Sequence, residues 1–379
     1  MIFILLCLDF WDIKPYGYIS PNLQLAMVFL YLCWGAHRFN DKSNFFNKNY
    51  AVPLKIIFLG ILLSMVSAFV YFGQTLIQSI VAYRNQYLIL SPLFIKKVFP
   101  SRQEVITGLY KFSIIYFVFA ILKLVFTSLF VSEATVEYSS FEDILLQGYS
   151  LLTIPLYFTL QELEKEWDTK QAIYALFIFS LIMLNGNRSS LFPMLILSGY
   201  MFFKINTPYR AIVITIIIIF SFLFLVAPIN EMIEEAQNQL NDPNYNRNKA
   251  MEYYIFNSIQ NIWCAIFGNG LISSHTSDVL SVLKSMGIVN SDLGFVGYWN
   301  QFGIIPIIVF LYLYIGTLVR KRMPIYLKLI SLQTLAGAFT ISYFGSIHHM
   351  LFFIFFYYLY NLELSKNHSV DNNLTCYGK

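Results

Sequence analysis

Long apolar stretches separated by short polar breaks recur along almost the whole chain. A helix needs about 20 predominantly apolar residues to cross a bilayer. The pattern predicts membrane helices at about residues 1–12, 21–38, 51–72, 74–95, 104–127, 143–160, 169–186, 189–205, 210–227, 301–319, 328–345 and 347–361. We therefore expect an all-α polytopic membrane protein with about twelve transmembrane helices, forming a single membrane domain over residues 1–379.

Composition favours the same class of protein. Hydrophobic residues make up 57% of the chain and charged residues only 12%. Backbone polar groups in lipid must bond within each helix or within a closed barrel, and a barrel would show short alternating segments instead of these long runs. Only Cys264 of the four cysteines falls in the largest loop, so no disulfide framework is indicated.

Basic residues are distributed unevenly between the two sets of loops. Loops on the side assigned to the cytoplasm carry sixteen Lys and Arg residues. The opposite side carries five, which are Lys14, Arg188, Arg247, Lys249 and Lys284. The positive-inside rule then places both termini in the cytoplasm, including a polar tail at residues 365–379 that we expect to be disordered. It places Arg188 and a large loop at residues 228–300 on the outer face. Arg84 falls in the middle of a predicted helix, where an arginine usually lines a polar cavity or pairs internally.

A polar break at residues 185–190, Asn-Gly-Asn-Arg-Ser-Ser, holds the outward Arg188 between two apolar runs. Both runs are too short to cross a bilayer alone, so Arg188 is expected at a membrane interface. Asn187, Ser189 or Ser190 can cap the second helix. A positive helix end beside a guanidinium suits an anion, above all a phosphate. The alternative is an interfacial arginine that snorkels to water.

The outer loop is the only soluble part large enough to build a site. A helix is predicted from about Asn246 to Gly268, with an apolar stripe at Met251, Ile255, Ile259 and Ile262. Arg247 lies in its first turn, where a cation opposes the helix dipole unless an anion is bound there. The alternative is a solvated loop arginine.

Two further polar residues of this loop are candidate site residues, Asp292 and His275. The alternatives are that Asp292 caps a helix and that His275 is merely exposed. The sequence has no Walker A loop, zinc signature, GxSxG motif or DxD-type carboxylate pair on the outer face, so we expect neither a metal nor a cofactor.

The order of these motifs resembles that of the Wzy-type polymerases of bacterial O-antigen and capsule repeat units, within the O-antigen polymerase and ligase superfamily. The resemblance covers residues 170–320, about half of the chain. It rests on Asn185–Ser190 with Arg188, the loop opening with Arg247, Phe267–Gly270, Ser291–Gly297 and Gln301–Ile304. It implies a GT-C-like membrane fold at the bacterial plasma membrane. It also implies a metal-independent glycosyltransferase that joins undecaprenyl-pyrophosphate-linked oligosaccharides at the outer face.

The resemblance also suggests roles for individual residues. Arg188 and Arg247 would hold the pyrophosphate, and Asp292 or, as second choice, His275 would be the catalytic base. Expected substrate-binding residues are Arg84, Asn187, Ser189 and Asn269. The implied partners are the lipid-linked donor and acceptor, the bilayer and a chain-length regulator membrane protein, with no nucleic acid. An O-antigen ligase is the nearest alternative, and a flippase for lipid-linked oligosaccharides is the alternative from a different class.

Overall fold

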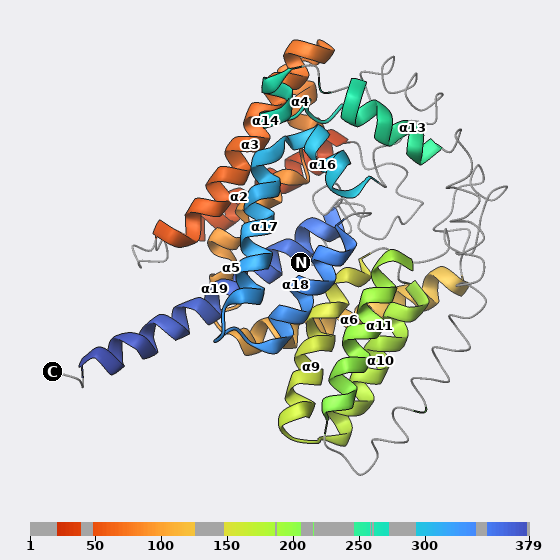
Figure 1. Cartoon of the computed structure of the whole chain (residues 1–379), viewed down its shortest axis with the longest axis vertical. Coiled ribbons are helices and arrows are strands. Elements are labelled where there is room, and N and C mark those ends of the chain that lie inside the picture. The colour runs from red at the N-terminus through yellow and green to blue at the C-terminus, as the bar shows by residue number, and fades with distance from the viewer. Residues whose placement is uncertain are drawn as a thin grey trace.

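The computed structural model describes residues 21–38, 48–125, 148–185, 188–205, 215, 246–257, 259, 261–272, 293–338 and 347–376. Within these ranges all regular elements are helices (Figure 1), which confirms the all-α expectation. The helices are α2 (Pro21–Arg38), α3 (Lys48–Phe72), α4 (Leu76–Ala82), η1 (Gln86–Leu90), α5 (Pro92–Val98), α6 (Arg102–Val125), η3 (Tyr149–Leu152), α9 (Thr153–Lys165), α10 (Thr169–Asn185), α11 (Arg188–Lys204), α13 (Asn246–Glu252), η4 (Tyr253–Asn257), α14 (Ile262–Phe267), α16 (Gly294–Phe302), α17 (Ile304–Val319), α18 (Ile325–Gly337) and α19 (Ile347–Cys376).

Several predicted membrane helices agree with the structure to within about three residues at each end, namely α2, α3, α6, α10 and α11. Polar side chains bond to backbone groups at two of the predicted starts. Ser101 Oγ accepts a hydrogen bond from the backbone N–H of Glu104 at the start of α6, and Asp168 accepts one from that of Lys170 at the start of α10. Such caps satisfy the donors that the first turn of a helix leaves unpaired.

The helix predicted at residues 74–95 is not continuous. α4 ends at Ala82, a turn at residues 83–85 follows, and η1 and α5 complete the segment. Pro92 occupies the first position of α5, where its missing N–H costs little. Tertiary contacts stabilise the turn, because the side chains of Tyr83 and Arg84 form hydrogen bonds to residues of α3 and α2.

Two further boundaries differ from the prediction. Gly303, expected inside the first turn of a membrane helix, instead separates α16 from α17 with a φ of 78°. The tail expected to be disordered after Leu364 continues as part of α19 to Cys376. Lys366 pairs with Glu363 one turn earlier at 3.5 Å, a spacing that supports a helix.

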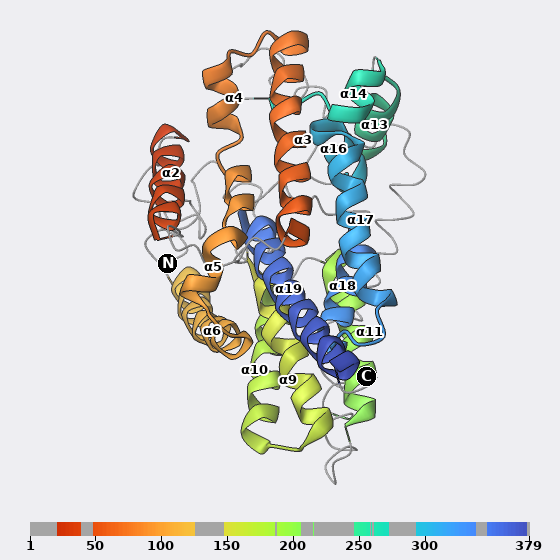
Figure 2. The ribbon, with the colours of Figure 1, turned by 90° about the vertical axis from the view of Figure 1, so that its left-hand side faces the viewer.

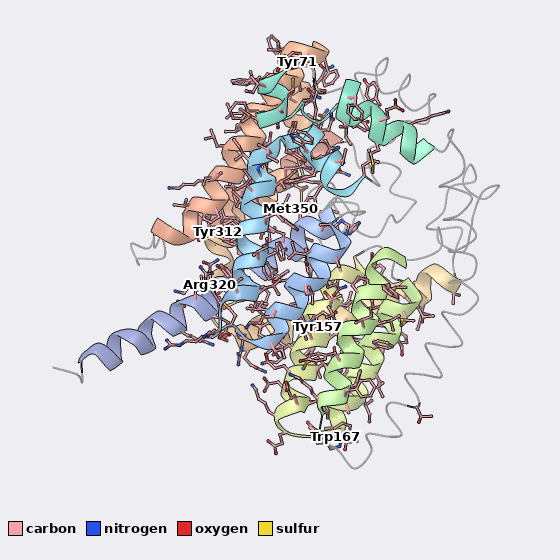
Figure 3. All side chains as sticks on the ribbon, in the orientation of Figure 1. Tyr71, Tyr157, Trp167, Tyr312, Arg320 and Met350 are labelled. Atoms are coloured by element: carbon pink, nitrogen blue, oxygen red, sulfur yellow. The ribbon has the colours of Figure 1, made fainter. Side chains whose placement is uncertain are left out.

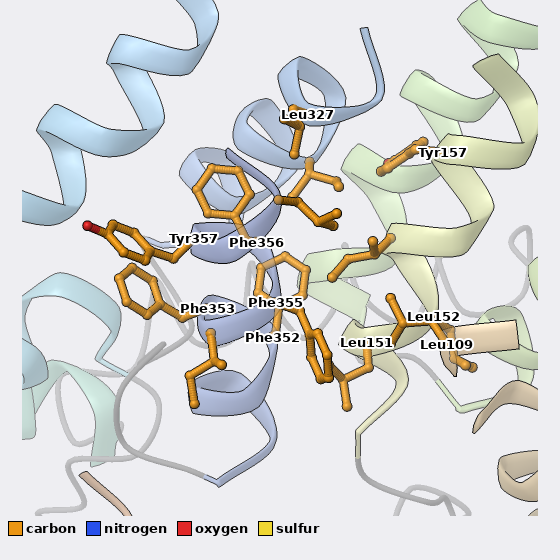
Figure 4. Packing of buried hydrophobic residues seen from close by; sticks show 14 of the residues in the cluster. Leu109, Leu151, Leu152, Tyr157, Leu327, Phe352, Phe353, Phe355, Phe356 and Tyr357 are labelled. Carbon is orange, nitrogen blue, oxygen red and sulfur yellow. The ribbon is translucent and has the colours of Figure 1, made fainter. Parts of the chain in front are cut away.

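Aromatic side chains dominate the core between α9, α17, α18 and α19, part of which Figure 4 shows. Tyr314 of α17 stacks on Phe356 of α19 with ring centroids 4.3 Å apart. Phe158 of α9 meets Tyr326 of α18 edge to face at 5.5 Å. Such pairs add to the large apolar area that each ring buries, so these helices form one packed unit.

Many large apolar side chains nevertheless remain on the surface. α11 exposes Phe192, Ile196, Tyr200 and Phe203, and α17 exposes Ile304, Ile308, Tyr312, Ile315 and Val319. Spacings of three and four residues place each set on one helix face. Soluble monomers rarely show contiguous apolar patches of this kind, whereas lipid-facing helices do.

Two described helices, Ala51–Phe72 of α3 and Arg102–Leu122 of α6, are long and apolar enough to cross a membrane. Shorter apolar helices cover Asn22–Gly35, Thr169–Leu184, Leu191–Lys204 and Ile304–Val319. The number of twelve membrane helices therefore stays a prediction.

α6 packs against α9. Arg102 and Tyr110 are two turns apart on α6, yet they contact the adjacent residues Phe158 and Thr159 of α9.

Candidate functional site

α11 begins at Arg188, and contacts at its far end fix the direction in which it runs. Lys204, the last residue of α11, lies 3.9 Å from Glu164 near the end of α9. Gln161 of α9 accepts a hydrogen bond from the backbone N–H of Tyr326 at the start of α18. α11 therefore runs antiparallel to α18, and Arg188 starts α11 at the end of the bundle where α18 ends.

The end of α18 is joined to the start of α16. The backbone N–H of Phe295 donates to the carbonyl oxygen of Ala338 at 2.9 Å. The helix that begins at Arg188 and the segment that follows Asp292 therefore border the same region of the fold.

α13 packs against this same segment. Ala250 of α13, Tyr254 of η4 and Leu293 form a small buried cluster. Arg247 lies three residues before Ala250 in α13. The backbone positions of Arg188 and Arg247 are thus linked through α18 and α16. In Figure 1, α13 lies above the upper ends of α10 and α11.

The face that α13 buries differs from the prediction. The helix starts at Asn246 as expected, but it passes into the π-helical turn η4 at Tyr253, and α14 is a separate helix capped by Asn261. The predicted stripe is therefore wrong in part, since Met251 and Ile262 are exposed while Ala250 and Tyr254 are buried. Burial raises the pKa of the Tyr254 phenol to about 12, so this hydroxyl stays neutral at physiological pH.

Two glycine-containing segments meet backbone to backbone, and we call residues 268–270 and 300–303 the glycine clasp. The N–H of Asn269 donates to the carbonyl of Asn300 at 2.6 Å, and that of Gly270 donates to the carbonyl of Gln301 at 3.0 Å. A Cβ on Gly268 would lie 2.5 Å from the Gln301 carbonyl oxygen, so a side chain cannot be placed there. The clasp joins the motif at Phe267–Gly270 to the motif at Gln301–Ile304, which lie before and after the second half of the outer loop.

Side chains of α3, of the α3–α4 link and of the turn after α4 hold Leu271, the residue that follows the first segment of the clasp. Tyr83 accepts a hydrogen bond from the backbone N–H of Leu271 at 2.8 Å and shares another with Ser64 at 2.8 Å. Gln74 donates to the carbonyl of Leu271 at 3.0 Å. Sequence reasoning missed these three residues, although isolated polar side chains in an apolar run are a recognisable signal of internal bonding.

Arg84 pairs internally, one of the two possibilities that its position suggested. Its Nε donates to the side-chain oxygen of Gln24 on α2, and its Nη1 donates to the carbonyl of Val81 at 3.2 Å. The half-buried guanidinium follows Tyr83 directly, so the break between α4 and η1 carries both an arginine and the anchor of the clasp.

The remaining candidate residues divide into two groups. Asn187, His275 and Asp292 lie outside the described residues. Ser189 is the second residue of α11, and Asn269 is buried inside the clasp. Over the ranges that the structure describes, no three His, Cys, Asp or Glu side chains are grouped so that they could hold a metal ion.

Comparison of the chain with models of protein families finds no match, and comparison with curated proteins finds none either.

Proposed function

We propose that this chain is a membrane glycosyltransferase that polymerises oligosaccharide repeat units carried on undecaprenyl pyrophosphate, at the outer face of a bacterial plasma membrane. One observation carries the proposal. The helices that bear Arg188 and Arg247, far apart in the sequence, are linked through α18 and α16 into one region. The exposed apolar faces of α11 and α17 support the membrane setting.

Two arginines in one region suit the chemistry of this reaction. The bond between the anomeric carbon and the pyrophosphate oxygen breaks, and the bonding electron pair leaves with the pyrophosphate. Guanidinium groups can stabilise this negative charge with paired N–H donors, without help from a metal ion. In this proposal Arg188 and Arg247 hold the leaving group.

The second half of the reaction forms the new glycosidic bond. A hydroxyl of the acceptor sugar attacks the anomeric carbon, which has oxocarbenium character, and gives its proton to a base. Asp292 is our first choice for this base, because it directly precedes Leu293 in the cluster that packs on α13. His275 is the second choice.

The other candidates support binding in this proposal. Asn187 and Ser189 flank Arg188 at the start of α11, and the buried Asn269 shapes the loop that follows α14. Arg84 holds the break in the α4–α5 segment near the clasp. The partners are the lipid-linked donor and acceptor, the bilayer and a chain-length regulator in the membrane.

Purified protein in lipid vesicles, supplied with one lipid-linked repeat unit, tests the activity. We expect a ladder of longer oligosaccharides, with one undecaprenyl pyrophosphate released for each bond formed and no loss of product in EDTA. A ligase would transfer the sugar only to a separate lipid acceptor, without a ladder. A flippase would move the substrate across the bilayer and form no bond. Either result, or a requirement for added magnesium or manganese, would contradict the proposal.

A further inference from the structure

Large apolar side chains are exposed along one face of α3, between Val52 and Val70. They are Val52, Ile56, Leu59, Leu62, Val66, Phe69 and Val70, with exposed fractions from 38% to 62%. Their spacing of three and four residues, with the last two adjacent, places them on one helix face. Among the described helices, it is also one of the two that are long and apolar enough to cross a membrane. Lys55, also exposed, lies on the same face near its beginning, so the uninterrupted apolar part of the face runs from Ile56 to Val70.

The apolar surface continues beyond the end of α3. Leu76 and Ile77, at the start of α4, are 64% and 75% exposed, and Ile262 of α14 is 78% exposed. Figures 1 and 2 both show α3, α4 and α14 together at the same end of the molecule, the end that Tyr71 marks in Figure 3. The exposed face thus includes part of the loop that we expected to be in water.

Specific hydrogen bonds attach α14 to the last two turns of α3. The indole N–H of Trp263 donates to Ser67 Oγ at 2.9 Å, and Asn261 Nδ2 donates to the hydroxyl of Tyr71 at 2.6 Å. α14 therefore lies at the same depth as the end of α3. If that end of α3 lies in the bilayer interface, α14 must lie there as well.

The charge pattern agrees with this placement. Neither residues 56–83 nor residues 253–274 contain a Lys, Arg, Asp or Glu, although each segment includes turns as well as helices. Turns in water are usually polar and commonly charged. Trp263 and Tyr71 are 39% and 37% exposed while their polar atoms are bonded. Partly exposed Trp and Tyr rings are enriched at the boundary between lipid and water.

We propose that the exposed face of α3, together with Leu76, Ile77 and Ile262, is a lipid-facing surface, and that α14 lies in the bilayer interface at that end of α3. The occupant of this surface is the lipid bilayer. The inference depends on membrane insertion of α3 and is independent of any glycosyltransferase activity. It has a consequence for the glycine clasp, which follows α14 directly and is thereby held at the membrane surface.

Nitroxide labels on single cysteines test the placement in full-length protein reconstituted in phosphatidylcholine vesicles. The labelled variants are Ile77→Cys and Ile262→Cys, in a background in which the native cysteines are replaced by serine or alanine. Collisions with molecular oxygen report apolar surroundings, and collisions with a water-soluble nickel chelate report water. We expect both labels to collide more with oxygen than with nickel.

Two matched variants provide the reference values. Leu59→Cys, in the middle of the exposed α3 face, serves as the lipid reference. Lys249→Cys, exposed on α13, serves as the water reference. The substitutions at residues 59, 77, 249 and 262 replace exposed side chains, so folding should be retained.

Three results would overturn the inference. Labels at residues 77 and 262 that match the water reference would show that α14 lies in water. Nickel access at residue 59 would show that α3 is not in the bilayer. Protection of residues 77 and 262 from both reagents would assign the surface to a protein contact instead of lipid. A lipid-like result in a protein without polymerase activity would leave this inference intact and would contradict only the proposed function.

Discussion

The phenol oxygen of Tyr83 accepts a hydrogen bond from the backbone N–H of Leu271 at 2.8 Å, which joins two positions 188 residues apart in the chain. Tyr83 is fully buried and also bonds to Ser64 of α3. The Tyr83 side chain thereby links the turn after α4 to the segment of the outer loop that follows α14.

Replacement of Tyr83 by phenylalanine tests how much the hydrogen bond to Leu271 contributes to stability. The N–H of Leu271 would lose its partner, and an unpaired buried donor costs about 1–3 kcal/mol. Ser64 would keep its bond to the carbonyl of Ile61. We expect a clear fall in the thermal unfolding midpoint in detergent. Tyr71→Phe is the matched control, because its hydroxyl lies on the exposed surface. Equal midpoints for the two variants would show that the buried bond adds little.

The glycine clasp gives a second prediction about stability. Gly303 has a φ of 78°, and a Cβ there would overlap the backbone of Ile266 and Phe267. Gly303→Ala should therefore prevent the two segments from meeting and should sharply lower the yield of folded protein. Gly316→Ala is the matched control in α17, because nothing lies within 4 Å of its added Cβ. Since alanine is favoured over glycine in a helix by about 1 kcal/mol, this control should be neutral or stabilising. Normal yield of Gly303→Ala would show that the contact does not form.

The orientation of the chain can be measured with reporter fusions. We expect cytoplasmic signals for fusions after Lys42 and Lys321, and outer signals after Glu137 and Asn257. A fusion at Gln161, a predicted loop position, is unsuitable because Gln161 is buried in α9 and bonds to Tyr326. Asp168, between α9 and α10, replaces it and should report the cytoplasm. An outer signal after Lys321 would reverse the orientation and remove the candidate site from the outer face.

The sequence predicts the helices where long apolar runs end in polar caps, as at Ser101 and Asp168. It fails where tertiary contacts decide the backbone. The break at residues 83–85 depends on partners in α2 and α3 that no local pattern reveals. Gly268 marks the end of a helix in the sequence, as the structure confirms, but its meeting with Gln301 is a long-range contact.

The candidate site could be predicted only as a set of positions. The polar break before α11 and the helix start at Asn246 agree with the structure. The predicted stripe is wrong at Met251, which precedes the π-helical turn, and after Tyr253 that turn shifts the later residues around the axis. The predicted substrate-binding role of Asn269 remains a prediction, and its backbone already bonds inside the clasp.

In the proposed mechanism Arg188 and Arg247 hold a pyrophosphate by paired hydrogen bonds. Arg188→Lys and Arg247→Lys keep the charge but lose the planar fork of donors. The loss of a preorganised donor to a developing anion costs about 3 kcal/mol, or roughly a hundredfold in rate. Arg322→Lys, on the loop between α17 and α18, is the control and should be close to neutral.

The most direct measurement is the turnover of each purified variant on the lipid-linked repeat unit, at matched protein level in vesicles. We predict a fall of about a hundredfold for Arg188→Lys and for Arg247→Lys, with Arg322→Lys near the unmodified rate. Normal turnover and normal chain lengths for both arginine variants would contradict the pyrophosphate clamp and would favour an interfacial role for Arg188.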